Sequence, residues 1–342
     1  MKYRTSLLII LLAGFVSLAA QGRKEPFTVM FYNVENLFDT LDAPDFEDEA
    51  FTPSGYKEWD DDRYEKKLTD VARVILSLPE KGLPALIGFS EVENAQVLED
   101  LAEMRGLRRG DYRVVLEESD DPRGIDCGLI YREDLFKYGG HELVEVKDLS
   151  GESYPLRGIL HVWGKGPDGR KLHLFINHWK SRRGGVQETE RLRMYAGIAM
   201  RRQLDRLLSQ ESTPRVILMG DFNDEPTNRS LMEAVHAANK RKNIWIGDLY
   251  NLHYDMHNLE DRGTYNYQGT WQMYDQIIVS YSLLEQRSGL TTSYDGGRIL
   301  KEEWMMITDE RNGEKVPLAT YWGDTYKGGA SDHLPVYVPF TY

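Results

Sequence analysis

Cysteine is almost absent from this chain of 342 residues, in which Cys127 is the only one. A single thiol cannot form a disulfide within the chain, so stability must come from a buried core. With 41% hydrophobic residues, the chain is long enough to bury a large core and is not disordered. No charged neighbour in the string I-D-C-G-L-I-Y would lower the pKa of this thiol. We interpret Cys127 as a small buried residue and not as a nucleophile.

Long apolar runs are also missing, except near the start of the chain. Lys2 and Arg4 precede an apolar segment at residues 7–20, which closes with small side chains. This pattern is typical of a secretory signal peptide, which we place at residues 1–20. A retained membrane anchor is the less favoured alternative, because the segment is short for a spanning helix. We therefore expect cleavage near Ala20, no membrane span afterwards, and export to the periplasm or the extracellular medium.

Positive charge is in deficit, since 42 Lys and Arg stand against 55 Asp and Glu, a net charge of −13. General attraction to polyanions is excluded as the main source of substrate affinity. The charges are unevenly spread, because residues 39–62 are dense in Asp and Glu and residues 180–206 are rich in Arg. We interpret the acidic segment as a solvated surface loop, with a secondary cation site as the alternative. The basic segment could still meet a phosphate locally.

Hydrophobic periodicity predicts strands interleaved with helices, without internal repeats or low-complexity linkers. Helical spacing occurs at residues 63–78, 97–104, 188–208 and 230–238. Apolar runs predict strands at residues 28–33, 85–89, 112–116, 126–131, 142–146, 156–163, 171–177, 216–219, 276–280 and 334–340. The early strands are separated by helices and later ones form hairpins, which favours mixed sheets packed together and flanked by helices. The arginines of the helix at 188–208 are interpreted as a solvated face paired with nearby acids.

Four short strings carry most of the polar chemistry. They are Y-N-V-E-N at residues 32–36, S-E-V-E-N at 90–94, G-D-F-N at 220–223 and S-D-H at 331–333. Each follows or borders a predicted buried strand, so their side chains can converge at one sheet edge. The carboxylates of Glu91, Asp221 and Asp332 would repel one another there unless a hard cation such as Mg²⁺ were bound. The sequence therefore indicates a metal-dependent hydrolase.

Taken together, these strings resemble the endonuclease/exonuclease/phosphatase superfamily, which includes deoxyribonuclease I, exonuclease III, neutral sphingomyelinases and inositol polyphosphate 5-phosphatases. N-H-W-K-S-R-R at residues 177–183 and Y-D-Q-I-I-V-S at 274–280 strengthen the resemblance, which runs from residue 27 to the C-terminus in the family's order. It implies a four-layer α/β sandwich, in which two packed mixed β-sheets are flanked by helices. It also implies one domain of this kind at residues 24–342.

The resemblance also implies roles for the motif residues. Asn33, Glu91 and Asp332 would hold or border the metal, Mg²⁺ or Mn²⁺, with Ca²⁺ also possible. Asp221 and Asn223 would orient the attacking water and bind phosphate oxygens. These roles agree with the chemistry of the side chains, because Mg²⁺ takes carboxylates and water and leaves room for substrate, and an amide binds a phosphate without repelling it.

Two histidines, His178 and His333, would flank the scissile phosphate, and Asp275 would hold His333 in one tautomer. The basic residues after His178 are expected to bind substrate: Lys180, Arg182 and Arg183. Deoxyribonuclease-like members carry an acid that orients the first histidine. Here only Asp126 lies near in sequence, and it is out of clear register, so this role is left open.

Taken singly, these residues have plainer interpretations. Asn33 could be a turn residue, Asp221 a helix N-cap, and His178 a hydrogen-bonded histidine at the core edge. Only their combination with Glu91 and Asp332 favours a phosphoesterase site.

Three classes of function remain. The favoured one is a secreted, metal-dependent, nuclease-like phosphodiesterase, a monomer acting on nucleic acid, because R-R-G-G follows His178 closely. The alternative is a phosphoesterase for phospholipid, sphingomyelin or inositol phosphate. A lipid hydrolase should expose an apolar hairpin beside the cleft; residues 265–271 are the best candidate and could equally stack bases. A non-catalytic binding protein is disfavoured, because the full set of polar motif residues is present.

Overall fold

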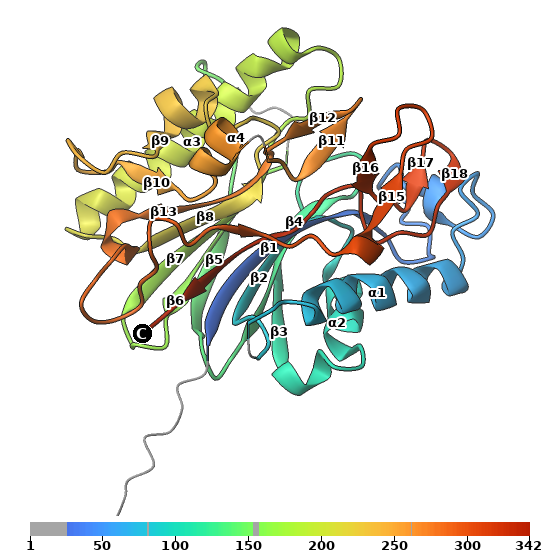
Figure 1. The fold of residues 1–342 in the computed structure, drawn as a ribbon, viewed down its shortest axis with the longest axis horizontal. Helices are drawn as coiled ribbons and strands as arrows, with labels where there is room; N and C mark the ends of the chain where they lie inside the picture. Colours follow the sequence, from blue (N-terminus) through green and yellow to red (C-terminus); the bar gives the residue numbers. More distant parts are fainter. Residues whose placement is uncertain (1–25, 81, 153–156, 261) are drawn as a thin grey trace, which may run out of the picture.

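The computed structural model describes residues 26–80, 82–152, 157–260 and 262–342 (Figure 1). The predicted signal peptide lies outside these residues. Within the described part of the chain, no helix has the length and apolar character needed to cross a membrane.

Two mixed β-sheets pack against each other, and we call them sheet A and sheet B. Sheet A has six strands in the order β14 (Arg298–Ile299), β19 (Val336–Phe340), β1 (Phe27–Leu37), β2 (Leu86–Val92), β4 (Asp126–Arg132) and β3 (Tyr112–Leu116). Sheet B has seven strands in the order β5 (Lys137–Val144), β6 (Ile159–Lys165), β7 (Lys171–His178), β8 (Val216–Asp221), β13 (Asp275–Ser280), β10 (Leu249–Asn251) and β9 (Ala237–Ala238). Helices lie on the outer faces of both sheets, so the predicted fold class is confirmed (Figure 1).

The alternation of apolar residues along β1 explains the layers. Val29 and Phe31 point into the core between the sheets, whereas Met30 and Tyr32 point to the core beneath the helices of sheet A. A strand buried on both faces reads as a continuous apolar run, which is why β1 was recognisable from sequence.

Helices α1 (Asp61–Leu76) and α2 (Ala95–Glu103) cover sheet A. The α1 helix begins where the Asp60 side chain accepts a hydrogen bond from Arg63 N, and α2 begins at the equivalent cap by Asn94. Sheet B is covered by α3 (Val186–Gln210) and a π-helical turn at Ser230–Val235, with α4 (Tyr254–Glu260) nearby. Short 3₁₀ turns lie at Glu49–Phe51, Arg108–Gly110, Tyr281–Leu283 and Glu303–Met305.

The helix predicted at residues 230–238 is wrong in its last three residues. His236 adopts a left-handed conformation with φ of 63°, which ends the π-helical turn. Ala237 and Ala238 then form β9, which pairs with β10. The small apolar side chains fitted both patterns, so the spacing could not separate them.

The acidic segment at residues 39–62 is more than a solvated loop. Its Phe51 and Trp59 rings pack together with 6.2 Å between centroids, and the Trp59 side chain is fully buried. Phe51 also contacts Tyr321 near the end of the chain. Many of its acids are exposed, as predicted, but the segment folds back over an aromatic cluster that supports the C-terminal region.

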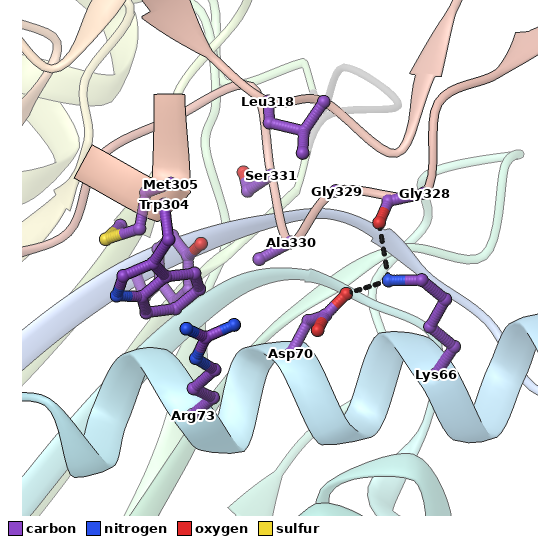
Figure 2. A pocket seen from close by; sticks show the side chains of 11 residues that line it. Lys66, Asp70, Arg73, Trp304, Met305, Leu318, Gly328, Gly329, Ala330 and Ser331 are labelled. Atoms are coloured by element: carbon purple, nitrogen blue, oxygen red, sulfur yellow. Dashed lines mark hydrogen bonds and ion pairs between the residues drawn. The ribbon is translucent and has the colours of Figure 1, made fainter. Parts of the chain in front are cut away.

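Three small hairpins lie outside the two sheets, and only the first was anticipated, as the candidate hairpin at residues 265–271. They are β11 (Tyr265–Tyr267) with β12 (Thr270–Gln272), β15 (Met306–Thr308) with β16 (Lys315–Pro317), and β17 (Tyr321–Trp322) with β18 (Thr325–Tyr326). The last two dock on α1, where Lys66 donates a hydrogen bond to Gly328 O and Arg73 lies 3.8 Å from the ring centroid of Trp304 (Figure 2). The crevice between α1 and these hairpins encloses about 130 Å³. Among the residues of the four motif strings, Tyr32 and Ser331 line it.

Candidate active site

Three polar side chains stand level with one another across sheet B. His178 in β7 is paired with Asp221 in the parallel strand β8, and Asp221 is paired with Asp275 in the antiparallel strand β13. We call this set the strand-end triad. All three residues are at most 5% exposed. Because strand pairing fixes their register, their relative positions are set by the backbone and not by flexible loops.

Sheet A supplies the opposite side of the site. Asn33 Nδ2 lies 3.0 Å from Asp221 Oδ2 and 3.3 Å from Glu91 Oε1, so this amide bridges the two sheets. Glu91 has φ of 60°, and the pairing of β2 with β4 shifts register there. Such an irregularity re-aims a side chain at the end of a strand. The backbone N–H of Asn36 donates to Glu91 Oε2 at 3.1 Å, which fixes the carboxylate further.

The S-D-H string joins the two sheets through hydrogen bonds. Ser331 Oγ donates to the carbonyl of Asn33 at 2.7 Å and accepts from the backbone N–H of His333. His333 Nδ1 lies 2.7 Å from Asp275 Oδ2, and its Nε2 lies 3.9 Å from both Asp221 Oδ2 and Asp332 Oδ1. The structure therefore gathers the motif residues at one place.

The two histidines have opposite electrostatic surroundings. Burial disfavours the charged form of His333, but Asp275, Asp332 and Asp221 outweigh it and raise its pKa well above the ordinary value. Burial lowers the pKa of His178 well below the ordinary value, and neighbouring Arg157 adds to this effect. The surroundings thus favour the charged imidazole at His333 and the neutral imidazole at His178.

The carboxylates of the site are crowded. Burial raises the pKa of Asp221 to about 6 against the opposing effect of His333, and Asp275 and Glu91 raise it further. Desolvation likewise raises the pKa of Asp332 to about 6, with Glu91 and Asp221 adding to it. This repulsion is what a bound cation would relieve, and the oxygen donors suit Mg²⁺ or Mn²⁺.

A second donor set lies beside the predicted metal residues. Asp221, Asp275 and His333 each offer one ligand atom, and these atoms lie within 4.8 Å of one another. His333 Nδ1 already lies against Asp275, so its Nε2 is the nitrogen that faces the other acids. We favour the oxygen donors Glu91 and Asp332, because hard divalent cations prefer oxygen to imidazole. Asn33 borders this position, since its Nδ2 faces Glu91 and Asp221 and its Oδ1 accepts from the backbone N–H of Glu35 at 3.0 Å.

Asp126 does not orient His178, the role that the sequence left open. Asp126 Oδ1 accepts a hydrogen bond from Ser119 N at 2.9 Å. Within the described residues, Nδ1 of His178 is buried without a hydrogen-bond partner. Its Nε2 lies 3.7 Å from both Glu91 Oε1 and Asp221 Oδ2. His178 therefore meets the acids of the site directly.

The three predicted substrate-binding residues are placed differently from one another. Arg183 is exposed and lines the cavity. Arg182 also reaches it but is held by hydrogen bonds to Asn223 O and Asp224. Lys180 does not line the cavity, and burial lowers its pKa, with Arg157 next in effect.

Two arginines that line the cavity were missed from sequence. Arg123 and Arg157 both pair with Asp121, at 3.0 Å and 2.8 Å. Arg157 is buried and donates to the carbonyls of His178 and Trp179. A topological signal did exist, because both precede strands that begin at the same sheet edge as the motifs.

The cavity encloses about 1070 Å³, and tyrosines form one of its walls. Tyr265 stacks on His333 with 4.8 Å between ring centroids and on Tyr274 at 5.7 Å. The opposite rim carries Tyr321, whose backbone N–H donates to the buried Glu35. Lys67 lies beneath this rim, where it donates to Glu35 O.

Residues 28–341 match the sequence pattern of the endonuclease/exonuclease/phosphatase family, and the chain belongs to it. A mannosyl-6-phosphatase of Bacteroides thetaiotaomicron is similar in structure, with a TM-score of 0.56 and 18% identity over 92% of this chain and 100% of that one. The catalytic domain of human nocturnin has a TM-score of 0.53 and 15% identity, over 92% of this chain and 94% of that domain. A humanized TDP2 of D. rerio has a TM-score of 0.52 and 14% identity, over 93% of this chain and 99% of that one. The comparison with curated proteins gives no match.

Membership of this family makes this chain a phosphoester hydrolase by class. Members of this family generally depend on a divalent metal, in agreement with the donor sets described above.

Proposed function

We propose that the chain is an exported phosphodiesterase that requires Mg²⁺ or Mn²⁺ and prefers nucleic acid. The observation that carries this proposal is the meeting of Glu91, Asp221 and Asp332 with two histidines at one place between the sheets. Hydrolysis of a phosphoester needs a positioned water, neutralisation of the negative charge on the non-bridging oxygens, and stabilisation of the leaving oxygen. A bound divalent ion would supply charge neutralisation at the phosphate.

The chain's own residues account for the other requirements. Asp221 is ionised above a pH of about 6 and lies at the centre of the site, where it can accept the proton of the attacking water. Asn223 donates its backbone N–H to Asp221 at 2.8 Å, which holds that carboxylate in place. The imidazolium of His333 stabilises negative charge on the phosphate in the transition state. The neutral His178 can donate a hydrogen bond to the phosphate from the other side.

The walls of the cavity favour a substrate with rings and more than one anionic group. Tyr267 is 57% exposed and offers a face on which a nucleobase can stack, and Arg123 and Arg183 offer charge to a neighbouring phosphate. The hairpin of β11 and β12 presents Tyr, Asn, Gln and Thr, and it lacks the aliphatic side chains that enter a lipid layer. Its Trp271 is partly buried and packs against the core beneath the helices of sheet A. A sugar or inositol phosphate is the second candidate, because a mannosyl-6-phosphatase shares the fold.

A substrate panel tests this proposal. The purified chain should be assayed with plasmid DNA, RNA, sphingomyelin, inositol phosphates, mannose 6-phosphate and bis-p-nitrophenyl phosphate, each with Mg²⁺, with Mn²⁺ and with EDTA. We expect metal-dependent cleavage of DNA or RNA and of the aryl diester. Turnover of only the phosphomonoesters would replace the nuclease assignment with a phosphatase, and the absence of any turnover would reject both.

A further inference from the structure

Arg193 in α3 is fully buried, whereas the arginines of this helix were predicted to form a solvated face. A buried guanidinium is costly unless its donors are satisfied by acids or carbonyls. Its Nε lies 2.7 Å from Asp224 Oδ1. Its terminal nitrogens donate to the backbone carbonyls of Lys180 and Val186 at 3.3 Å and 3.0 Å. Arg193 thus touches both ends of the basic loop at residues 180–186.

The partner of Arg193 is attached to the G-D-F-N string. Asp224 is 2% exposed and directly follows Asn223. Ser230 Oγ donates to its carboxylate, and Arg182 Nη2 donates to it at 3.0 Å. The same Arg182 donates from Nε to the carbonyl of Asn223 at 2.9 Å. Asn223 itself has φ of 48°, a conformation that a non-glycine residue keeps only when its surroundings hold it.

We infer that Arg193 and Asp224 are positioning residues for the reaction. The pair fixes Asn223 and Arg182 from below, although neither member lines the cavity. The role of Asn223 in holding the Asp221 carboxylate rests on the function proposed above. Displacement by about 1 Å at such a site can lower a rate by about 100-fold, so a buried ion pair behind the site can control turnover without touching substrate.

The chain contains a matched control for this inference. Arg215 is 3% exposed and pairs with Asp168 at 2.9 Å, so it is a second buried arginine with one acidic partner. It precedes β8, whereas Asp221 is the last residue of that strand, so it lies at the end of the sheet remote from the site. Arg193→Met and Arg215→Met each remove a buried guanidinium from its acid. Asp224 keeps its hydrogen bonds from Arg182 and Ser230, and Asp168 keeps those from the backbone N–H groups of Arg170 and Leu290. Only the first should disturb the site.

The experiment compares the two variants at a temperature where both are folded by circular dichroism. With bis-p-nitrophenyl phosphate, Arg193→Met should lower kcat by about tenfold or more and change KM less than about threefold, while Arg215→Met stays within about twofold of the wild type. Hydrogen exchange at residues 180–186 and 222–228 should accelerate in Arg193→Met alone. Equal kcat losses in the two variants, or unchanged exchange at both segments, would overturn the inference.

Two further measurements keep the test decisive. If Arg193→Met does not fold, Arg193→Lys replaces it. A lysine can reach Asp224 but lacks the guanidinium group that donates to two carbonyls at once. A smaller kcat loss with faster exchange is then expected, and wild-type behaviour in both readouts would contradict the inference. If the wild type cleaves no phosphoester, the proposed function fails on its own, and calorimetry with inorganic phosphate replaces turnover. Weaker phosphate binding in the Arg193 variant than in the Arg215 variant supports the inference, and equal binding overturns it.

Discussion

The Nδ1 atom of His333 lies 2.7 Å from Oδ2 of Asp275, and both side chains are almost completely buried. Asp275 is paired in strand β13, and its backbone N–H donates to Thr264 Oγ1 at 3.2 Å. Among the described residues, its other carboxylate oxygen is buried without a hydrogen-bond partner. The charge of this acid is therefore balanced chiefly by the imidazolium, and the two residues form one electrostatic unit.

A double-mutant cycle tests this unit. His333→Ala and Asp275→Asn should each lower kcat by about 100-fold, because the first removes the cation at the phosphate and the second removes its partner. The double variant should be little slower than His333→Ala alone. Steady-state kinetics on variants that are folded by circular dichroism provide the measurement. Losses that multiply independently would show that Asp275 acts apart from His333.

Metal dependence gives a second prediction. EDTA should abolish hydrolysis, and Mg²⁺ or Mn²⁺ should restore it, because Glu91 and Asp332 otherwise repel each other in the cleft. Glu91→Ala should raise the metal concentration needed for half-maximal rate. An unchanged titration curve would assign Glu91 a structural role, and full activity in chelator would exclude the proposed mechanism.

The cationic wall gives a third prediction. Arg123→Gln should raise KM for a dinucleotide substrate by about threefold to tenfold, since a charged hydrogen bond to phosphate is lost from a half-exposed side chain. Arg113→Gln is the control, because Arg113 is equally exposed but pairs with Glu133 and does not line the cavity. Equal KM values for the two variants would remove Arg123 from the substrate contacts.

Asp126 gives a prediction about pH. Burial raises its pKa to about 7, against hydrogen bonds from Ser119, whereas the unfolded chain releases this proton near a pH of about 4. The folded state holds the extra proton between these values, so this group lowers the free energy of unfolding as pH rises through that window. Asp126→Asn should therefore be more stable than the wild type at pH 8 by about 1 kcal/mol or more, with little difference at pH 4.

Urea unfolding at both pH values measures this difference, and the same samples serve for kinetics. The kcat of Asp126→Asn should match the wild type, because Asp126 does not contact His178. A large fall in kcat without loss of stability would restore the orienting role that the sequence left open for this acid.

Export gives the last prediction. If residues 1–20 are a signal peptide, the mature chain should begin near Ala20 or Gln21 and fractionate outside the inner membrane. Intact mass and N-terminal sequencing of the native protein decide this. A membrane-bound product that keeps Met1 would instead indicate an uncleaved anchor.

The sequence was most informative where chemistry and strand ends coincide. Asn33, Glu91 and Asp221 directly follow apolar runs, so local pattern alone indicated that they could meet. Arg193 was misread because helical spacing predicts which face a residue occupies but not which loops cover that face. Arg123 was missed because its importance depends on β4 running antiparallel to β2, a pairing between distant segments. The hairpins at residues 306–317 and 321–326 were missed because strands of two or three residues have no periodicity to detect.

The strand-end triad has a consequence for how this chain could acquire new substrates. His178, Asp221 and Asp275 are tied together by the backbone ladder of three adjacent strands, whereas the cavity walls come from separate excursions at residues 180–186, 265–272 and 321–323. The first excursion also holds Asn223 through Arg182, and the second stacks Tyr265 on His333, whereas the third makes no such contact with the strand-end triad within the described part of the chain. Substrate choice can therefore drift most freely by replacement of residues 321–323, and a loop grafted there from a relative should redirect this chain without rebuilding its reactive centre.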